Sequence, residues 1–291
     1  MRRTIKHGVL ILGLAFGLGS CAEDREFHTD LGEDSISGLE TLSLGLTEKD
    51  MQLLAEKNVS AMTVFVYLND SMVTQKELNL ASEALTVDVP LGEKLKTFAV
   101  ANAGSVIDAD SLSTVVIYQD ERCSKEVFIS NIAEFTSDRT QPTVELSLTR
   151  RVGQAVFQPS ESSELLAANT SFDELAVTFN SVITGYKVID GSGVQDTITV
   201  STNAAAGYAV EIYSFPTTSD NNPMNIEMVY KKSGAQVNKT SAPYEMAAYF
   251  AVSKRITISA PILNENFLES PFASLRTFSL PVGVQIQETE F

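Results

Sequence analysis

The sequence predicts an all-β protein whose strands pack as β-sandwiches. Short runs of apolar or alternating residues recur along the chain, and Gly, Asn, Asp, Ser or Pro bounds each run, which is typical of strands joined by turns. Helical periodicity is rare. Hydrophobic residues make up 44% of the 291 residues, which is enough to bury a core. Many short strands at regular spacing favour sandwiches, and this length favours two domains over one.

Five strands are predicted in the first half of the chain. Leu42, Leu44 and Leu46 fall at alternate positions, which indicates a half-buried strand. The run from Met62 to Leu68 is apolar at all but one position, and this indicates a strand that is covered on both faces. The other three runs are Leu85–Val89, Thr97–Ala101 and Val144–Leu148.

The second half repeats this pattern, and its last run is the most regular. Apolar residues at positions 278, 280, 282, 284 and 286 share one face, and Ser, Pro, Gly and Gln lie between them. These five residues are Phe278, Leu280, Val282, Val284 and Ile286. The other predicted strands are Gln154–Phe157, Leu175–Phe179, Tyr186–Ile189, Thr197–Val200, Tyr208–Tyr213, Asn225–Tyr230 and Arg255–Ile258.

Helical signals are confined to two places. Residues 47–50, Thr-Glu-Lys-Asp, resemble a capping box and predict a short helix that ends at about Lys57. The segment from Ser111 to Ile117 fits a helix or a strand equally well, and the sequence does not decide between them.

The first twenty residues have the pattern of a targeting segment. Arg2, Arg3 and Lys6 are positively charged, and an apolar run follows from Val9 to Leu18 that is too short to span a membrane as a stable helix. The run ends in Leu18-Gly19-Ser20-Cys21, which resembles the lipobox of bacterial lipoproteins. The alternative is an ordinary secretory signal that happens to end beside a cysteine.

The lipobox resemblance implies how the mature chain is anchored. Small residues at Gly19 and Ser20 let the signal peptidase reach the bond before Cys21, whose thiol carries the lipid. Lipid chains then hold the protein on a membrane without a transmembrane helix. Ala22, where Asp would signal inner-membrane retention in some bacteria, favours the outer membrane. The acidic pair at residues 23–24 resembles a surface-export tag of Bacteroidales lipoproteins, and an acidic pair is also what a solvated tether contains.

These signals divide the chain into four parts. Residues 1–20 are the predicted signal peptide. Residues 21–38, which are polar, acidic and rich in Gly and Ser, form a lipidated flexible tether. A basic pair between two strands, near Thr149–Arg151, marks the boundary between an N-terminal β-sandwich, residues 39–149, and a C-terminal β-sandwich, residues 150–291.

Charge excludes two classes of partner. The formal net charge is −16, whereas nucleic acids and anionic membrane surfaces are bound through clustered Lys and Arg. We therefore expect no nucleic acid partner. The only membrane contact that we expect is the lipid on Cys21.

The residues needed for catalysis are scarce, and we expect a protein that is not an enzyme and uses no cofactor or metal. His28 is the only histidine after the signal peptide and lies in the tether, so no histidine-based triad or metal cluster can form. Cys123 has no histidine to activate it and fits a buried small residue better. Asp108 and Asp110 could bind a hard cation, although two loop carboxylates are usually just solvated.

Four segments in a fixed order resemble one family. A lipobox with its tether is followed by MTVFVYLNDSMVTQKEL at 62–78, TFAVANAG at 97–104 and LTRRVGQAVF at 148–157. This order resembles the fimbrillin-like superfamily of Bacteroidales (type V) pili, which includes shaft subunits, tip subunits and membrane anchors of the FimB type. The resemblance implies two tandem transthyretin-like β-sandwich domains and partners that are other fimbrial subunits, joined by strand exchange.

Strand exchange also has a physical basis. An open sheet edge leaves N–H and C=O groups unpaired, and a partner strand with alternating apolar residues satisfies both the edge and the apolar slot beside it. The run from Phe278 to Ile286 has the form of such a donor strand. It also has the form of the last strand of its own domain.

The position of arginines favours the anchor role. In the shaft subunits of the family, an Arg-specific protease removes the first strand. Here no arginine occurs between Arg25 and Arg122, and only Lys49 and Lys57 follow the first predicted strand closely. We therefore expect a lipid-anchored subunit at the fibre base, on the outer membrane and exposed at the cell surface. The alternatives are a tip adhesin and a glycan-binding uptake lipoprotein. The glycan alternative rests on Tyr186, Tyr208, Tyr213, Tyr230, Tyr244 and Tyr249 as a stacking platform.

Four short motifs suggest glycosylation. Asp followed by Ser or Thr and an apolar residue resembles the O-glycosylation motif of exported Bacteroidales proteins, and each match also reads as a turn entering a strand. The four hydroxyl residues are Ser35, Ser71, Ser111 and Thr197.

Overall fold

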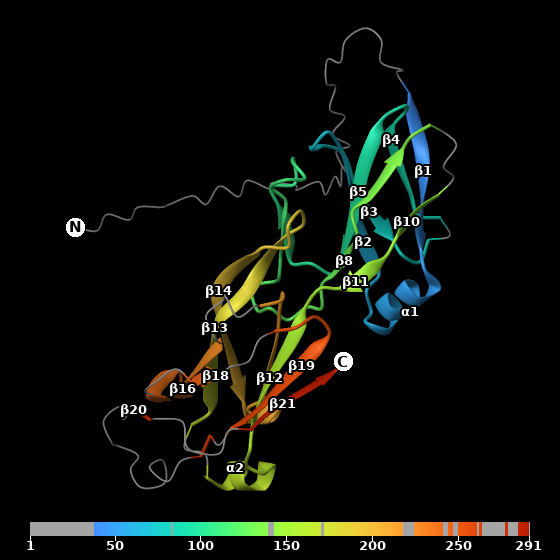
Figure 1. Ribbon diagram of the computed structural model, residues 1–291. Helices are drawn as coiled ribbons and strands as arrows, with labels where there is room; N and C mark the ends of the chain where they lie inside the picture. The colour runs from blue at the N-terminus through green and yellow to red at the C-terminus, as the bar shows by residue number, and fades with distance from the viewer. Residues whose placement is uncertain are drawn as a thin grey trace, which may run out of the picture. The chain divides into compact units, whose positions relative to one another are not determined.

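The computed structural model confirms the all-β sandwich class (Figure 1). All residues that it describes belong to one compact unit. They are residues 38–82, 84–138, 143–169, 172–217, 224–240, 244–246, 250–260, 262–263, 277–278 and 285–290.

A six-stranded and a three-stranded sheet, both from the first half of the chain, enclose one core. Leu42 and Leu44 of β1 pack there with Val64 and Val66 of β2. The helix α1 (Glu48–Glu56) follows β1 and contributes Leu54. The six-stranded sheet has the order β11 (Leu148–Arg150), β8 (Phe128–Ser130), β5 (Lys94–Ala101), β2 (Ala61–Leu68) and β3 (Ser71–Asn79), and β9 (Ala133–Thr136) also pairs with β5. The three-stranded sheet has the order β10 (Thr143–Leu146), β1 (Leu39–Leu46) and β4 (Thr86–Pro90).

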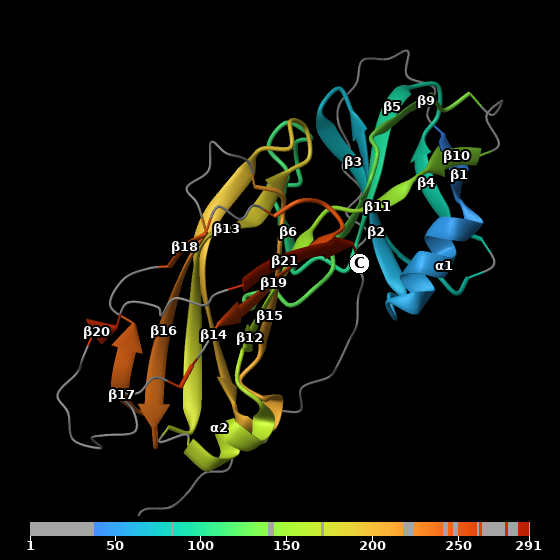
Figure 2. The ribbon, with the colours of Figure 1, turned by 60° about the horizontal axis from the view of Figure 1, so that its bottom comes forward.

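Two further sheets enclose a second core that comes mainly from the second half (Figure 2). Phe157 and Ile256 of one sheet pack there with Val177 and Phe179 of the other. The four-stranded sheet has the order β15 (Val210–Ser214), β12 (Gly153–Pro159), β19 (Lys254–Ala260) and β21 (Gln285–Glu290). The eight-stranded sheet has the order β20 (Thr277–Phe278), β17 (Ala235–Thr240), β16 (Met224–Lys232), β13 (Glu174–Lys187), β7 (Val116–Tyr118) and β6 (Ser105–Ile107), with β14 (Gly193–Asn203) on β13 and β18 (Tyr244–Met246) on β16. The helices α2 (Ser163–Asn169) and η1 (Ala204–Ala206) connect strands.

A third core joins residues of the two halves. Phe65 and Phe98, from β2 and β5, belong to the same buried cluster as Ile183 and Phe215. Strand β7 lies in the first half of the sequence but pairs with β13, from Gly185↔Tyr118 to Lys187↔Val116. The predicted division into residues 39–149 and 150–291 stays a prediction, and strand pairing crosses it at this point.

Strand β2 is covered on both faces, as its sequence predicts. Val64 and Val66 point into the first core, whereas Phe65 and Tyr67 point into the third, and all four are 0–1% exposed. The Phe98 ring stacks on Phe65 at 5.1 Å and on Tyr67 at 5.9 Å between ring centroids. A strand with a core on each side needs apolar residues at every position, and this explains the unbroken run.

The predicted first helix is confirmed, with its cap. The backbone N–H of Asp50 donates to Thr47 Oγ1 at 3.1 Å, so the threonine side chain satisfies one of the free N–H groups of the first turn. The undecided segment from Ser111 to Ile117 is a turn that leads into β7, which begins at Val116.

Several predicted strands have different bounds in the structure, and two of them are interrupted by a break or a turn. Val144–Leu148 is divided at Ser147, because the backbone N–H of Ser147 donates to Asn131 Oδ1 at 2.9 Å and the chain passes from one sheet to another. The strand predicted at 186–189 ends at Lys187. The chain turns there, since the N–H of Gly191 donates to Lys187 O at 2.9 Å and Gly191 has a φ of 72°.

The third core generates a stability prediction. We expect Phe215→Ala to lower the free energy of unfolding by about 3–5 kcal/mol, because Phe215 is fully buried and stacks on Tyr186. Ile189→Ala, at a side chain that is 48% exposed, is the matched control and should change it by less than about 0.5 kcal/mol. Urea unfolding measures both. Equal effects of the two substitutions would contradict the packing described.

Candidate functional site: the first strand and its two neighbours

The first strand fills a slot between two other strands. β1 pairs in parallel with β10, from Ser43↔Thr143 to Leu46↔Leu146, and antiparallel with β4, from Leu39↔Pro90 to Ser43↔Thr86. It is therefore the middle strand of its sheet. We call β1 together with its neighbours β4 and β10 the first-strand site.

Side chains of β1 complete the first core. Leu42 is 2% exposed and Leu44 is 6% exposed, and both belong to the cluster that includes Val87 and Val89 of β4 and Val144 of β10. Without β1, the apolar side chains of this cluster would face solvent and two strand edges would be unpaired.

Hydrogen bonds fix β1 beyond the regular ladder. The N–H of Leu44 donates to Leu85 O at 2.8 Å, and the N–H of Leu91 donates to Gly38 O at 3.0 Å. The Thr41 hydroxyl donates to Asp88 Oδ1 at 2.7 Å. These bonds hold the strand in one register with β4.

The two lysines after β1 have different surroundings. Lys49 is exposed within α1. Lys57 Nζ lies 2.9 Å from Glu126 Oε1, and the other oxygen of this carboxylate lies 2.8 Å from Arg150 Nη2. Glu126 and Arg150 are largely buried, at 11% and 7% side-chain exposure. A buried carboxylate between two cations ties the end of α1 to β11.

This ion-pair group continues into the second half of the chain. The Tyr213 hydroxyl lies 3.4 Å from Glu126 Oε1 and donates to Glu211 Oε1 at 2.7 Å, and Gln154 Nε2 donates to Tyr213 Oη at 3.0 Å. Burial, followed by the nearby carboxylates, raises the pKa of Tyr213, so the hydroxyl keeps its proton and remains a donor. The sequence predicts a domain boundary at the basic pair Arg150–Arg151, but it does not predict that Arg150 is buried.

The predicted donor residues lie in two different strands. Phe278 is in β20, which pairs with β17, and Ile286 is in β21, which pairs antiparallel with β19. Leu280, Val282 and Val284 lie outside the described residues. β21 is the last strand in its sheet order, and Lys254 Nζ lies 3.1 Å from Glu290 Oε1 across the pair. Donation of this strand stays a prediction.

The lipobox residues Leu18, Gly19, Ser20 and Cys21, together with His28 and Ser35, lie outside the described residues. In the part of the chain that the structure describes, no helix has the length and apolar character needed to cross a membrane. Within the same part, no group of three His, Cys, Asp or Glu residues is arranged to hold a metal ion.

Two of the glycosylation-like motifs meet in space. Residues 71 and 111 form a β-bridge, and the Ser111 hydroxyl donates to Asp70 Oδ2 at 2.6 Å. Ser113 also donates to Asp70, from its N–H at 2.7 Å and its hydroxyl at 2.8 Å. These hydrogen bonds hold the pKa of Asp70 below its usual range. Ser71 is exposed, and the Thr197 hydroxyl lies 3.1 Å from Asn180 Oδ1.

The prediction of a tyrosine stacking platform for a glycan is wrong at three of its positions. Tyr208, Tyr213 and Tyr230 are buried, and two of them pack against Phe172, with ring centroids at 5.1 Å and 4.9 Å. Tyr186 stacks on Phe215 at 5.3 Å. These rings serve the cores instead of a shared surface, because tyrosine is a common packing residue in strands.

We expect Leu44→Ala to lower the free energy of unfolding by about 2–5 kcal/mol, because it opens a cavity beneath β1. Leu39→Ala, in the same strand but at a side chain that is 66% exposed, is the matched control and should cost less than about 0.5 kcal/mol. Denaturant unfolding of the two variants measures this difference. A Leu44→Ala variant as stable as the control would show that β1 does not contribute to the core.

Cys123 is expected to be unreactive in the folded protein. Burial, followed by the charge of Asp120, raises the pKa of this thiol to about 12. Because the unfolded thiol ionises near its ordinary value, Cys123 contributes stability that is full below that pKa and is lost as the pH rises toward 12. In a Cys21→Ser variant at pH 8, a thiol reagent should modify Cys123 only after denaturant is added. Equal rates in folded and unfolded protein would contradict the burial.

Comparison with known proteins finds no matching family model and no matching curated protein by sequence. Solved structures do match. A candidate adhesin of Bacteroides ovatus ATCC 8483 has a TM-score of 0.52 at 11% identity, covering 75% of this chain and 88% of that one. A candidate cell adhesion protein of Bacteroides eggerthii DSM 20697 has a TM-score of 0.50 at 11% identity, covering 91% and 98%. Another candidate adhesin of Bacteroides ovatus has a TM-score of 0.50 at 10% identity, covering 87% and 95%. The chain therefore shares the fold of these proteins.

Proposed function

We propose that this protein is a cell-surface fimbrial subunit of the fimbrillin-like type, anchored to the outer membrane through lipid on Cys21, and that it lies at the base of the fibre. The observation that carries the proposal is the first-strand site, which the protein's own β1 fills. The fold shared with candidate adhesins and a candidate cell adhesion protein supports the adhesive, non-catalytic class.

An occupied first-strand site restricts how the subunit can assemble. A subunit accepts a donated strand only where a sheet edge and the apolar slot beside it are open. Here β4 and β10 are already paired with β1, and Leu42 and Leu44 fill the slot. Such a subunit cannot accept a strand at this place while β1 remains, so it terminates the fibre.

The same strand connects the lipid to the folded body. The tether, residues 21–38, leads directly into β1. Retention of the lipid therefore requires that the chain is not cut between Cys21 and the end of β1. The two ladders of β1, together with its buried leucines, carry the load between the membrane and the rest of the subunit.

The sequence after β1 offers poor sites for removing it. Lys49 lies within α1, and Lys57, at the end of that helix, is ion-paired with Glu126. Cleavage at either lysine first requires that α1 unfolds locally. This arrangement supports retention of β1 over the processing of shaft subunits.

A tip adhesin is the second candidate, because the similar structures are candidate adhesins and a candidate cell adhesion protein. A tip subunit would also end the fibre, but at the far end from the membrane. The two roles differ in whether the lipid on Cys21 stays attached in the assembled fibre.

We also propose that the Asp-Ser/Thr motifs differ in their availability for glycosylation. Ser71 is exposed, whereas the hydroxyls of Ser111 and Thr197 are bonded to Asp70 and Asn180. Ser71 is therefore the best-placed acceptor among the three that the structure describes.

The anchor role predicts an intact N-terminus in the assembled fibre. After mild crosslinking of outer membranes from the native cells, mass spectrometry should find a lipid-modified Cys21 peptide joined to residues 39–46, and crosslinks to a second fimbrial chain. Cys21→Ala should release the protein from the membrane fraction while the folded body is unchanged. A mature N-terminus beyond residue 47 would refute the anchor role and favour a shaft or tip subunit.

A further inference from the structure

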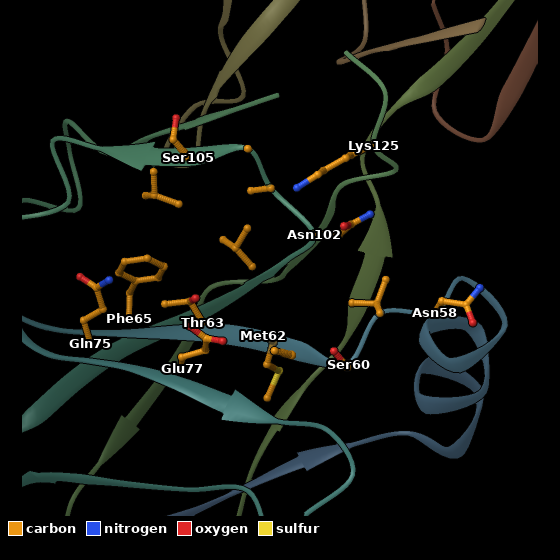
Figure 3. Close-up of a pocket in the computed structure, with 16 residues that line it drawn as sticks. Asn58, Ser60, Met62, Thr63, Phe65, Gln75, Glu77, Asn102, Ser105 and Lys125 are labelled. Carbon is orange, nitrogen blue, oxygen red and sulfur yellow. The ribbon is translucent and has the colours of Figure 1, made fainter. Parts of the chain in front are cut away.

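A hollow of about 490 Å³ lies on the face of β2, β3 and β5 that is turned away from the first core (Figure 3). Its lining includes Thr63 and Phe65 of β2, Gln75 and Glu77 of β3, and Val100 of β5. Residues 102–106 and Lys125 form the other side. Neither the anchor role nor the first-strand site uses this hollow, so it needs a separate explanation.

Strand register brings the floor of the hollow together. Thr63 is opposite Glu77 on β3 and opposite Val100 on β5, and Phe65 is opposite Gln75. Because side chains at alternate positions share a face, these five residues form two adjacent rows across three strands. Phe65 and Val100 are buried beneath this floor, and the partly exposed apolar side chains of the lining include Ala61, Ala103 and Val106.

The loop wall is held by its own contacts. Asn102 follows β5 and has a φ of 61°, and its Nδ2 donates to the carbonyl of Glu126 at 3.0 Å. The N–H of Gly104 donates to Tyr118 O at 2.9 Å, and Ser105 begins β6. The loop is thus fixed to β7 and to the segment that carries Lys125, so the hollow is formed without a ligand.

Several polar side chains in the hollow are available to a ligand. Among the described residues, the side chains of Gln75, Glu77 and Lys125 have no hydrogen-bond or ion-pair partner. Figure 3 shows Glu77 and Lys125 on different sides of the hollow. It therefore offers an acidic acceptor, a cationic donor and an amide that both donates and accepts.

This mixture narrows the class of ligand. Half of the sixteen lining residues have polar side chains, which disfavours a lipid. Charges of both signs disfavour a polyanion or a polycation. An added peptide strand is disfavoured too, because the backbone of β2 is already paired with β3 and β5 on its two sides. The volume is within the roughly 300–1,000 Å³ range of small-molecule sites.

We propose that the hollow binds a short carbohydrate segment of one or two sugar units. Sugar hydroxyls both donate and accept, as the amide, carboxylate, hydroxyl and ammonium groups here require, and the C–H face of a sugar ring fits the partly exposed side chains of Ala103 and Val106. The described residues that line this site include none of the tyrosines on which the sequence-based glycan alternative rested. The inference is independent of the anchor role.

The test uses the purified mature chain. A set of defined disaccharides, namely lactose, cellobiose, maltose, mannobiose and chitobiose, is titrated while amide chemical shifts and heat are recorded. At least one should bind saturably, with a Kd of about 1 mM or tighter. The double substitution Gln75→Ala with Glu77→Ala, at two exposed positions, should weaken that binding at least tenfold. Ser105→Trp, which fills the hollow, should abolish it.

Lys76→Ala is the matched control, because Lys76 is an exposed neighbour in β3 that does not line the hollow; its binding should equal that of the unsubstituted chain. Three results would overturn the inference: no disaccharide binds saturably, the double variant binds as tightly as the control, or an alanine tripeptide binds as well as the best sugar. An unfolding scan confirms that each variant is folded. The two proposals can fail separately. If a sugar binds here but the mature chain from the cells lacks Cys21, the carbohydrate site is supported and only the anchor role is refuted.

Discussion

Burial of β2 on both faces is the constraint on which the rest of this structure depends. One face, with Val64 and Val66, requires a covering sheet, and β1, β4 and β10 supply it. The other face, with Phe65 and Tyr67, is covered by residues such as Ile183 and Phe215 from the second half of the chain. Where that cover ends, toward Thr63, the hollow begins. The first-strand site, the contact between the halves and the proposed carbohydrate site are therefore built on one strand.

A buried carboxylate connects the same parts by polar contacts. Glu126 is shared between Lys57, at the end of the helix that follows β1, and Arg150, in β11. Tyr213 of β15 lies beside it. Removing one partner of a buried ion pair leaves an uncompensated charge, so such groups tolerate little rearrangement. The first-strand site is consequently coupled to the junction between the halves by a polar group as well as by apolar packing.

These constraints agree with a subunit that ends a fibre. A strand that is hydrogen-bonded on both sides and that contributes leucines to the core is an integral part of the domain. In the proposed anchor, the tether and lipid are attached to this strand. Membrane attachment and a closed first-strand site therefore both depend on β1. The hollow on the opposite face of β2 is left open to a ligand in this arrangement.

The sequence by itself determined most of the local structure, because local structure depends on neighbouring residues. Alternation of Leu42 and Leu44 predicted a strand with one buried face, the unbroken run around Phe65 predicted a strand with two, and Thr47 predicted the start of α1. The sequence did not predict strand β3, which lies at the end of its sheet order. Gln75, Lys76 and Glu77 are polar on both of its faces, so its residues do not alternate between apolar and polar.

Only the tertiary structure decided which segments meet. The break at Ser147, the pairing of β7 with β13, the burial of Arg150 and the packing of Tyr208 and Tyr230 all depend on partners that are distant in sequence. The hollow is of the same kind, because Thr63, Gln75 and Val100 share a floor only through the register of three strands. A one-residue change of register would turn each of these side chains to the other face, and the pairing of Thr63 with Val100 joins segments that are distant in sequence.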